Sequence, residues 1–129
     1  MSTIFSKIID GSIPCYKVAE NEQFLAFLDI QPLVKGHVLV IPKVEVDFIF
    51  DLDDSILSGM MVFAKEVALK MKKVLPCKKI GVTVIGLEVP HAHIHLLPIN
   101  GIADMDFSKA KLSFPPIEME AVQSLIQNA

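Results

Sequence analysis

Residues 90–98 read Pro-His-Ala-His-Ile-His-Leu-Leu-Pro, and they hold three of the four histidines of the chain. Alternation of histidine with apolar residues is typical of a β-strand, in which successive side chains point to opposite faces. We therefore expect the three histidines on one face of a strand and Ala92, Ile94 and Leu96 on the other. The first face would carry chemistry, and the second would pack into the core.

The rest of the chain predicts further strands around a single long helix. β-branched and aromatic stretches bounded by turn residues predict strands at residues 16–20, 23–29, 36–42 and 79–85. Between residues 54 and 75, apolar residues recur every three to four positions, acidic residues lie at the start, and Pro76 follows the end. This pattern is typical of an amphipathic helix. A short helix is expected after Pro115 and Pro116.

Length and composition predict one domain over residues 1–129, with residues 115–129 as a C-terminal helical extension. No apolar run reaches the roughly 18 residues of a membrane span, and no secretory signal is visible. Two cysteines without a CxxC motif, Cys15 and Cys77, suggest reduced thiols and a cytoplasmic protein. A formal net charge of −3 gives no basic face for nucleic acid. We expect neither a nucleic-acid partner nor a membrane partner.

The histidine run has three interpretations. A metal site would need all three rings to reach one ion, although the outer two start roughly 13 Å apart on a strand that rises about 3.3 Å per residue. A His-x-His pair with a third ligand stays open, but residues 96–100 supply no carboxylate. A solvent-exposed polar strand would not need histidine at three positions. The favoured interpretation uses imidazole as an acid, a base or a nucleophile.

A nucleophilic imidazole must be neutral, with one ring nitrogen free and the other held by an acceptor. The middle residue of the run, His93, has an imidazole on each side. These neighbours could orient it, donate hydrogen bonds to an anionic substrate, or protonate a leaving group. A phosphate ester or a phosphoramidate is the substrate class that fits such a group.

The run resembles the signature of the histidine triad (HIT) family, His-x-His-x-His-x-x with apolar x, at residues 91–97. Residues 4–14, 27–32 and 36–42 also resemble family segments, in the same order. The resemblance implies an α+β fold with an antiparallel sheet of about five strands, one long helix and a short C-terminal helix. It implies a homodimer in which the sheet continues between subunits. It also implies hydrolase or transferase activity, without a cofactor, on the α-phosphate of a purine nucleotide, such as an adenosine phosphoramidate or a dinucleoside polyphosphate.

Carried over to this sequence, the resemblance makes His93 the nucleophile that forms a nucleotidyl-histidine intermediate, which water later hydrolyses. His91 and His95 become its orienting and phosphate-contacting neighbours. His37 joins them from an adjacent strand, although by itself it could be a purely structural histidine.

The resemblance also assigns residues to the nucleotide. Asp29 matches the acidic residue that holds the ribose hydroxyls, and Phe27 and Ile30 flank the base. From local sequence alone, Asp29 could instead be a turn residue, and Phe27 and Ile30 could be core residues.

The approach to the run departs from the family pattern. Leu87 stands where the family has Gln, no Asn precedes it, and the Gly-rich loop is missing. The two residues whose side-chain amides contact the phosphate in the family therefore have no match here, and backbone amides near Gly86 or those of Glu88 and Val89 could replace them. Ser6 occupies the position of a zinc-binding cysteine in some members, so we expect no structural zinc.

Two function classes follow. The main hypothesis is a nucleotide phosphoramidase or nucleotidyl hydrolase. The alternative, prompted by the shortened loop, is a nucleotide-binding or interaction module with weak or no turnover. A transferase of the uridylyltransferase branch is disfavoured, because that branch has Gln where His95 stands.

Overall fold

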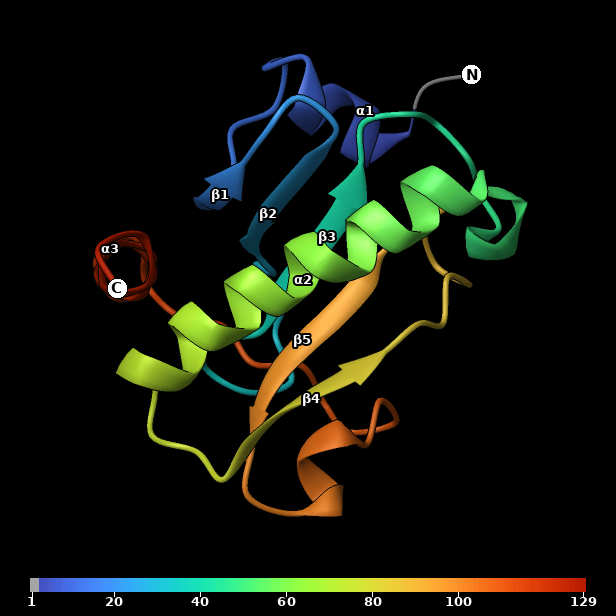
Figure 1. The fold of residues 1–129 in the computed structure, drawn as a ribbon. Helices are drawn as coiled ribbons and strands as arrows, with labels where there is room; N and C mark the ends of the chain where they lie inside the picture. Colours follow the sequence, from blue (N-terminus) through green and yellow to red (C-terminus); the bar gives the residue numbers. More distant parts are fainter. Residues whose placement is uncertain (1–2) are drawn as a thin grey trace.

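In a computed structural model that describes residues 3–129, five strands form one sheet in the order β1-β2-β3-β5-β4 (Figure 1). All neighbouring strands are antiparallel. The strands are β1 (Lys17–Glu20), β2 (Phe24–Leu28), β3 (Val38–Pro42), β4 (Lys79–Thr83) and β5 (Ile94–Ile99). They occupy the predicted stretches and are shorter by one to three residues at their ends.

The described residues also form three α-helices and two short 3-10 helices: α1 (Ile4–Ile9), η1 (Ile49–Asp51), α2 (Asp54–Val74), η2 (Ile102–Met105) and α3 (Pro116–Gln127). The long helix α2 begins at the predicted residue, and Lys72 and Lys73 in its last turn complement the helix dipole. The α+β fold class, with one long helix and a short C-terminal helix, is confirmed. The helix α1 was not predicted.

The histidine strand is shorter than predicted. β5 begins at Ile94, so His91 and His93 lie before the strand and only His95 lies within it. The backbone leaves the sheet here, because the Ala92 N–H donates to the Val46 carbonyl (2.6 Å), outside any strand. The apolar residues of the run still point to the predicted side, because Ala92 and Ile94 both pack in the core under α2.

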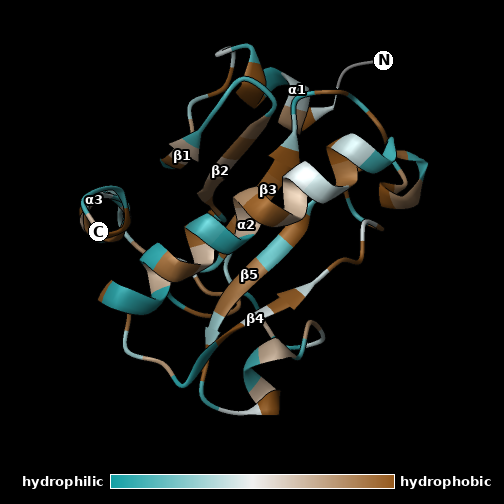
Figure 2. Ribbon diagram, in the orientation of Figure 1, coloured by the Kyte–Doolittle hydropathy of each residue, from teal (hydrophilic) through white to brown (hydrophobic). Residues whose placement is uncertain are grey.

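The two faces of the sheet pack against different helices. One face packs against α2 in a core that includes Val40 of β3 and Ile94 of β5. Figure 2 shows β2 and β3 as largely hydrophobic where α2 crosses them. On the other face, Phe27 and Leu39 pack with Phe5 of α1. This second face carries the cleft described below.

The two ends of the sheet also differ. The helix α3 lies beside β1, where the side-chain amides of Gln123 and Gln127 donate to the Lys17 carbonyl (2.9 and 2.7 Å). At the opposite end lies β4, paired with β5.

Within residues 3–129, no helix combines the length and the apolar character that crossing a membrane requires.

Candidate active site

A cleft of about 500 Å³ opens on the face of the sheet opposite α2. Its walls come from α1 and the following loop, the end of β2 and the loop to β3, the loop between β4 and β5, and the segment after β5. Every predicted site residue lines it except His91. These lining residues are Phe27, Asp29, Ile30, His37, Glu88, Val89, His93 and His95.

His91 is fully buried behind the cleft, and its ring does not orient His93 as predicted. Its Nε2 donates to the Pro42 carbonyl (2.9 Å), and its Nδ1 lies 3.2 Å from the Thr3 hydroxyl. These partners hold the ring away from the cleft, because both of its nitrogens are used within the protein. The orienting group that His91 supplies is its backbone carbonyl.

His93 is held in one tautomer by that carbonyl. Its Nδ1 lies 2.7 Å from the His91 oxygen, which can only accept, so Nδ1 carries the proton. The other nitrogen, Nε2, therefore has a free lone pair. The edge of the Phe5 ring packs against the imidazole, with centroids 5.1 Å apart and planes at 83°. The site thus presents an oriented imidazole with its unprotonated nitrogen available.

His37 and His95 form a second ordered pair. The Leu33 N–H donates to His37 Nδ1 (3.2 Å), so His37 carries its proton on Nε2. That Nε2 lies 2.9 Å from Nδ1 of His95 and donates to it, which leaves the His95 proton on Nε2. The His95 ring lies 4.8 Å from the His93 ring between centroids. A hydrogen-bond donor and a nucleophile therefore stand side by side.

Burial keeps the cleft histidines neutral near pH 7. Burial and the neighbouring His95 lower the pKa of His37 to about 3. Burial and the neighbouring His93 lower the pKa of His95 to about 4. Burial also lowers the pKa of His93, although its bond to the His91 carbonyl acts in the opposite direction. None of the three rings supplies a positive charge.

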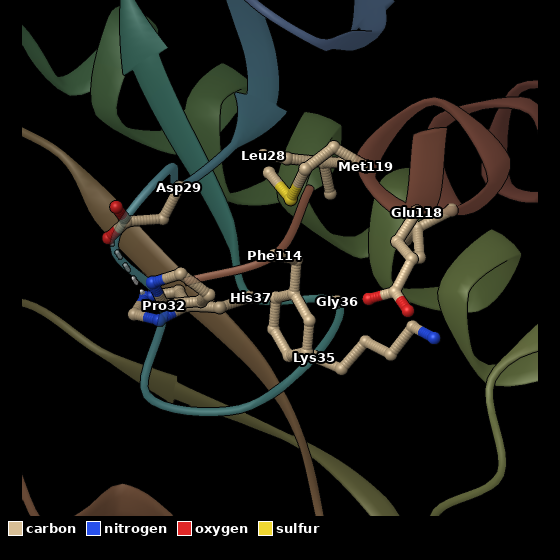
Figure 3. Close-up of a pocket in the computed structure, with 10 residues that line it drawn as sticks. Leu28, Asp29, Pro32, Lys35, Gly36, His37, Phe114, Glu118 and Met119 are labelled. Carbon is tan, nitrogen blue, oxygen red and sulfur yellow. Dashed lines mark ion pairs between the residues drawn. The ribbon is translucent and has the colours of Figure 1, made fainter. Parts of the chain in front are cut away.

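Asp29 faces His37 across the end of β2 (Figure 3), with Oδ2 3.9 Å from His37 Nε2. Its Oδ1 accepts from the Gln31 N–H (2.9 Å), so it is also a turn residue. Burial raises the pKa of the carboxyl group. Phe27 is buried with Phe5, whereas Ile30 is 65% exposed, so the alternative interpretation of Ile30 as a core residue is wrong.

The loop between β4 and β5 forms the opposite wall of the cleft. Leu87 is 88% exposed and lies at the cleft mouth. Glu88 is exposed as well, and its carboxylate pairs with the Lys111 ammonium group (3.2 Å). Gly86 has φ of 74°, a backbone conformation that favours glycine.

Several lining residues were not assigned to the site from the sequence, and two of them, Phe107 and Lys111, contact other site residues. Phe107 packs edge-on against His95, with centroids 4.9 Å apart, and Lys111 reaches Glu88. Both come from the segment after β5, which shows no periodic pattern. The one signal in this segment was a single aromatic residue among polar residues, and it does not predict where the segment lies in the fold.

Within residues 3–129, no group of three or more His, Cys, Asp or Glu side chains is arranged to hold a metal ion.

Comparison with known proteins shows which family the chain resembles. The sequence pattern of the HIT domain matches residues 10–101. An uncharacterized HIT-like protein of Mycoplasma genitalium is 38% identical over 102 residues, which cover 75% of this chain and 72% of that protein. The adenosine 5'-monophosphoramidase of Saccharomyces cerevisiae is 40% identical over 96 residues, which cover 74% of this chain and 61% of that protein.

A solved structure extends the likeness to nearly the whole chain. The crystal structure of a Hit-like protein involved in cell-cycle regulation from Bartonella henselae matches with a TM-score of 0.86 and 27% identity, covering 98% of this chain and 95% of that one. The family pattern spans most of the sequence, and the chain belongs to the HIT domain family.

Proposed function

We propose that this protein is a nucleotide phosphoramidase that works through His93. The observation that carries the proposal is the oriented, neutral imidazole whose Nε2 is unprotonated within a cleft of nucleotide size. Family membership supports nucleotide hydrolase activity, and a yeast relative of this chain is an adenosine 5'-monophosphoramidase.

In the proposed reaction, Nε2 of His93 attacks the α-phosphorus and forms a P–N bond as the P–N bond to the amine breaks. The amine takes a proton from solvent water and leaves, and the nucleotidyl-histidine that remains gives a proton back when water hydrolyses it. Water then attacks the same phosphorus, releases the nucleoside monophosphate and restores the imidazole. His95 would donate a hydrogen bond from Nε2 to a phosphate oxygen, since a neutral imidazole is a good donor and a poor acid. His37 would hold His95 in that tautomer.

The nucleotide would lie between the two walls of the cleft. Asp29 would accept from the ribose hydroxyls, and Phe27 and Ile30 would flank a purine base. None of the hydrogen bonds among the described residues uses the backbone N–H of Glu88 or Val89 as donor, so both amides remain free to bind phosphate. We also propose a homodimer in which two sheets join through β4.

The test is turnover of adenosine phosphoramidate by the wild type and by His93→Ala. Loss of the nucleophile should lower kcat by at least about 10³-fold, as for other covalent catalysts. Rapid trapping at neutral pH should reveal a nucleotide-mass adduct in the wild type, because phosphohistidine is acid-labile. A wild type that leaves the substrate intact, together with an unchanged His93→Ala, would rule out the hydrolase.

The alternative is a nucleotide-binding module with weak or no turnover. The observation that favours it is Leu87, an exposed apolar side chain where an amide contact to the phosphate was expected. Removal of one such contact can cost about 10²- to 10³-fold in kcat. Calorimetry that detects AMP binding by a protein without turnover would support this alternative.

A further inference from the structure

The histidines of the cleft provide no positive charge for an anionic ligand near pH 7. A nucleotide brings at least one negative charge, and the three buried histidines are neutral near pH 7. The cleft wall also holds the carboxyl groups of Asp29 and Glu88, which repel an anion. Among the described residues that line the cleft, Lys111 is the only Lys or Arg.

Two contacts hold the Lys111 segment over the cleft. On one side of Lys111, the Phe107 ring packs against His95. On the other side, the Leu112 N–H donates to the Pro32 carbonyl (2.8 Å), in the loop that follows Asp29. Lys111 therefore lies between two points that are fixed to the site, and its ammonium group pairs with Glu88 at the cleft wall.

The position of the ammonium group is consistent with action on the reacting end of the cleft. Its positive charge contributes to the lowered pKa of His37 and of His95, where burial has the larger effect. The partner of the ammonium group in the structure is the carboxylate of Glu88, whose side chain is 79% exposed. An exposed ion pair of this kind contributes little to stability and is easily exchanged for a better anion.

We propose that Lys111 is the phosphate-binding cation of the cleft, paired with Glu88 in the free protein and with the anionic phosphate oxygens when a nucleotide binds. The inference rests on the proposed nucleotide-binding function. The inference gives the segment after β5 a role in nucleotide recognition. It also predicts that Lys111 contributes to binding of the phosphate and not to binding of the nucleoside.

The test compares AMP with adenosine by calorimetry at low salt. Lys111→Met should weaken AMP binding by about tenfold or more, because a charge-assisted contact is lost, and should leave adenosine binding within about twofold. Lys111→Arg should retain AMP affinity. Lys109→Met, an exposed lysine of the same segment outside the cleft wall, is the matched control and should bind both ligands as the wild type does.

Glu88→Gln separates phosphate binding from simple tethering of the two segments. If Lys111 binds phosphate, removal of its carboxylate partner should leave AMP affinity equal or higher. Weaker AMP binding in Glu88→Gln, or equal losses of AMP and adenosine in Lys111→Met, would overturn the inference and leave the ion pair a structural one. A wild type that binds no AMP would contradict the proposed function as well as this inference. If the wild type turns over substrate and Lys111→Met binds AMP as tightly as the wild type does, only this inference is contradicted.

Discussion

Each cleft histidine has a ring nitrogen whose role is set by a neighbouring group. The His91 carbonyl accepts from His93, and the Leu33 N–H donates to His37, which in turn donates to His95. We therefore expect the proton of His93 on Nδ1, and the protons of His37 and His95 on Nε2, at neutral pH. Proton–nitrogen correlation spectra of isotope-labelled protein distinguish these tautomers.

Single histidine substitutions would assign the three rings in those spectra. A His93 ring protonated on Nε2 would contradict the proposed nucleophile, because the attacking nitrogen would have no free lone pair. A doubly protonated ring at neutral pH would contradict the neutral cluster.

Neutral, buried histidines also make stability depend on pH. Burial lowers the pKa of His37 to about 3 and that of His95 to about 4, from an ordinary value of 6.5. Below pH 6.5 the unfolded chain binds protons that the folded cluster does not, so the free energy of unfolding should fall as the pH drops from 6.5 toward 4. Each histidine contributes up to about 1.4 kcal/mol per pH unit in that window, and nothing well above it.

Urea unfolding between about pH 7 and pH 5 measures this dependence. The control is His95→Asn, whose amide oxygen can accept the His37 hydrogen bond in place of Nδ1. It removes one titrating group, so its stability should fall less steeply with decreasing pH. Equal slopes for the two proteins would contradict a lowered pKa for His95.

Elements with a regular repeat could be predicted from the sequence, and elements fixed by distant contacts could not. The apolar spacing of α2 and its stop at Pro76 are local features, and they gave its limits to within one residue. The helix α1 has only six residues and is held by a capping box at Thr3 and by packing of Phe5 on the sheet. A helix this short is unstable alone, so its own sequence does not predict it.

The same distinction applies to the cleft. The alternating run predicted His93 and His95 as neighbours, the resemblance added His37 from another strand, and all three line the cleft. The turn of the backbone before β5 depends on a bond from Ala92 to Val46, and it gave His91 a different position. The Lys111 segment lies at the site because Phe107 packs against His95 and Leu112 donates to the Pro32 carbonyl, and no local pattern contains these contacts.

The N-cap of α1 also supports the first histidine of the run. The Thr3 hydroxyl accepts from the Ser6 N–H (3.1 Å) and lies 3.2 Å from Nδ1 of His91. Because His91 Nε2 donates to Pro42, its Nδ1 needs a donor. Thr3→Val would leave this buried nitrogen unpaired, and we expect a loss of about 1–3 kcal/mol in the free energy of unfolding, measured in urea.

Thr3→Ser keeps the hydroxyl and is the matched control, expected within about 1 kcal/mol of the wild type. Turnover should also be lower in Thr3→Val than in Thr3→Ser, because the backbone of His91 orients His93. A loss in Thr3→Ser without a loss in Thr3→Val would show that Thr3 acts through the packing of its methyl group and not through the hydrogen bond, because valine keeps the methyl group and serine does not.

At the scale of the whole molecule, the two ends of the sheet are covered to different extents. At β1, α3 lies alongside the strand and its glutamine amides bind the Lys17 carbonyl. At β4, Val82 is 50% exposed and Val84, just beyond the strand, is 39% exposed. A free edge strand that carries apolar side chains favours pairing with a second strand. The β4 edge is therefore where the proposed homodimer would form.

Sedimentation equilibrium tests this assembly directly. We expect the wild type at twice the 14.2 kDa of one chain, and Val82→Lys at the mass of a single chain, because a lysine at the joint would place two like charges close together. Val44→Lys, a substitution of another valine that is 43% exposed and lies beyond β3, should remain a dimer. Val82 does not line the cleft, so monomeric Val82→Lys should retain AMP binding. A wild type that sediments as a monomer, or a Val82→Lys protein that stays dimeric, would contradict pairing through β4.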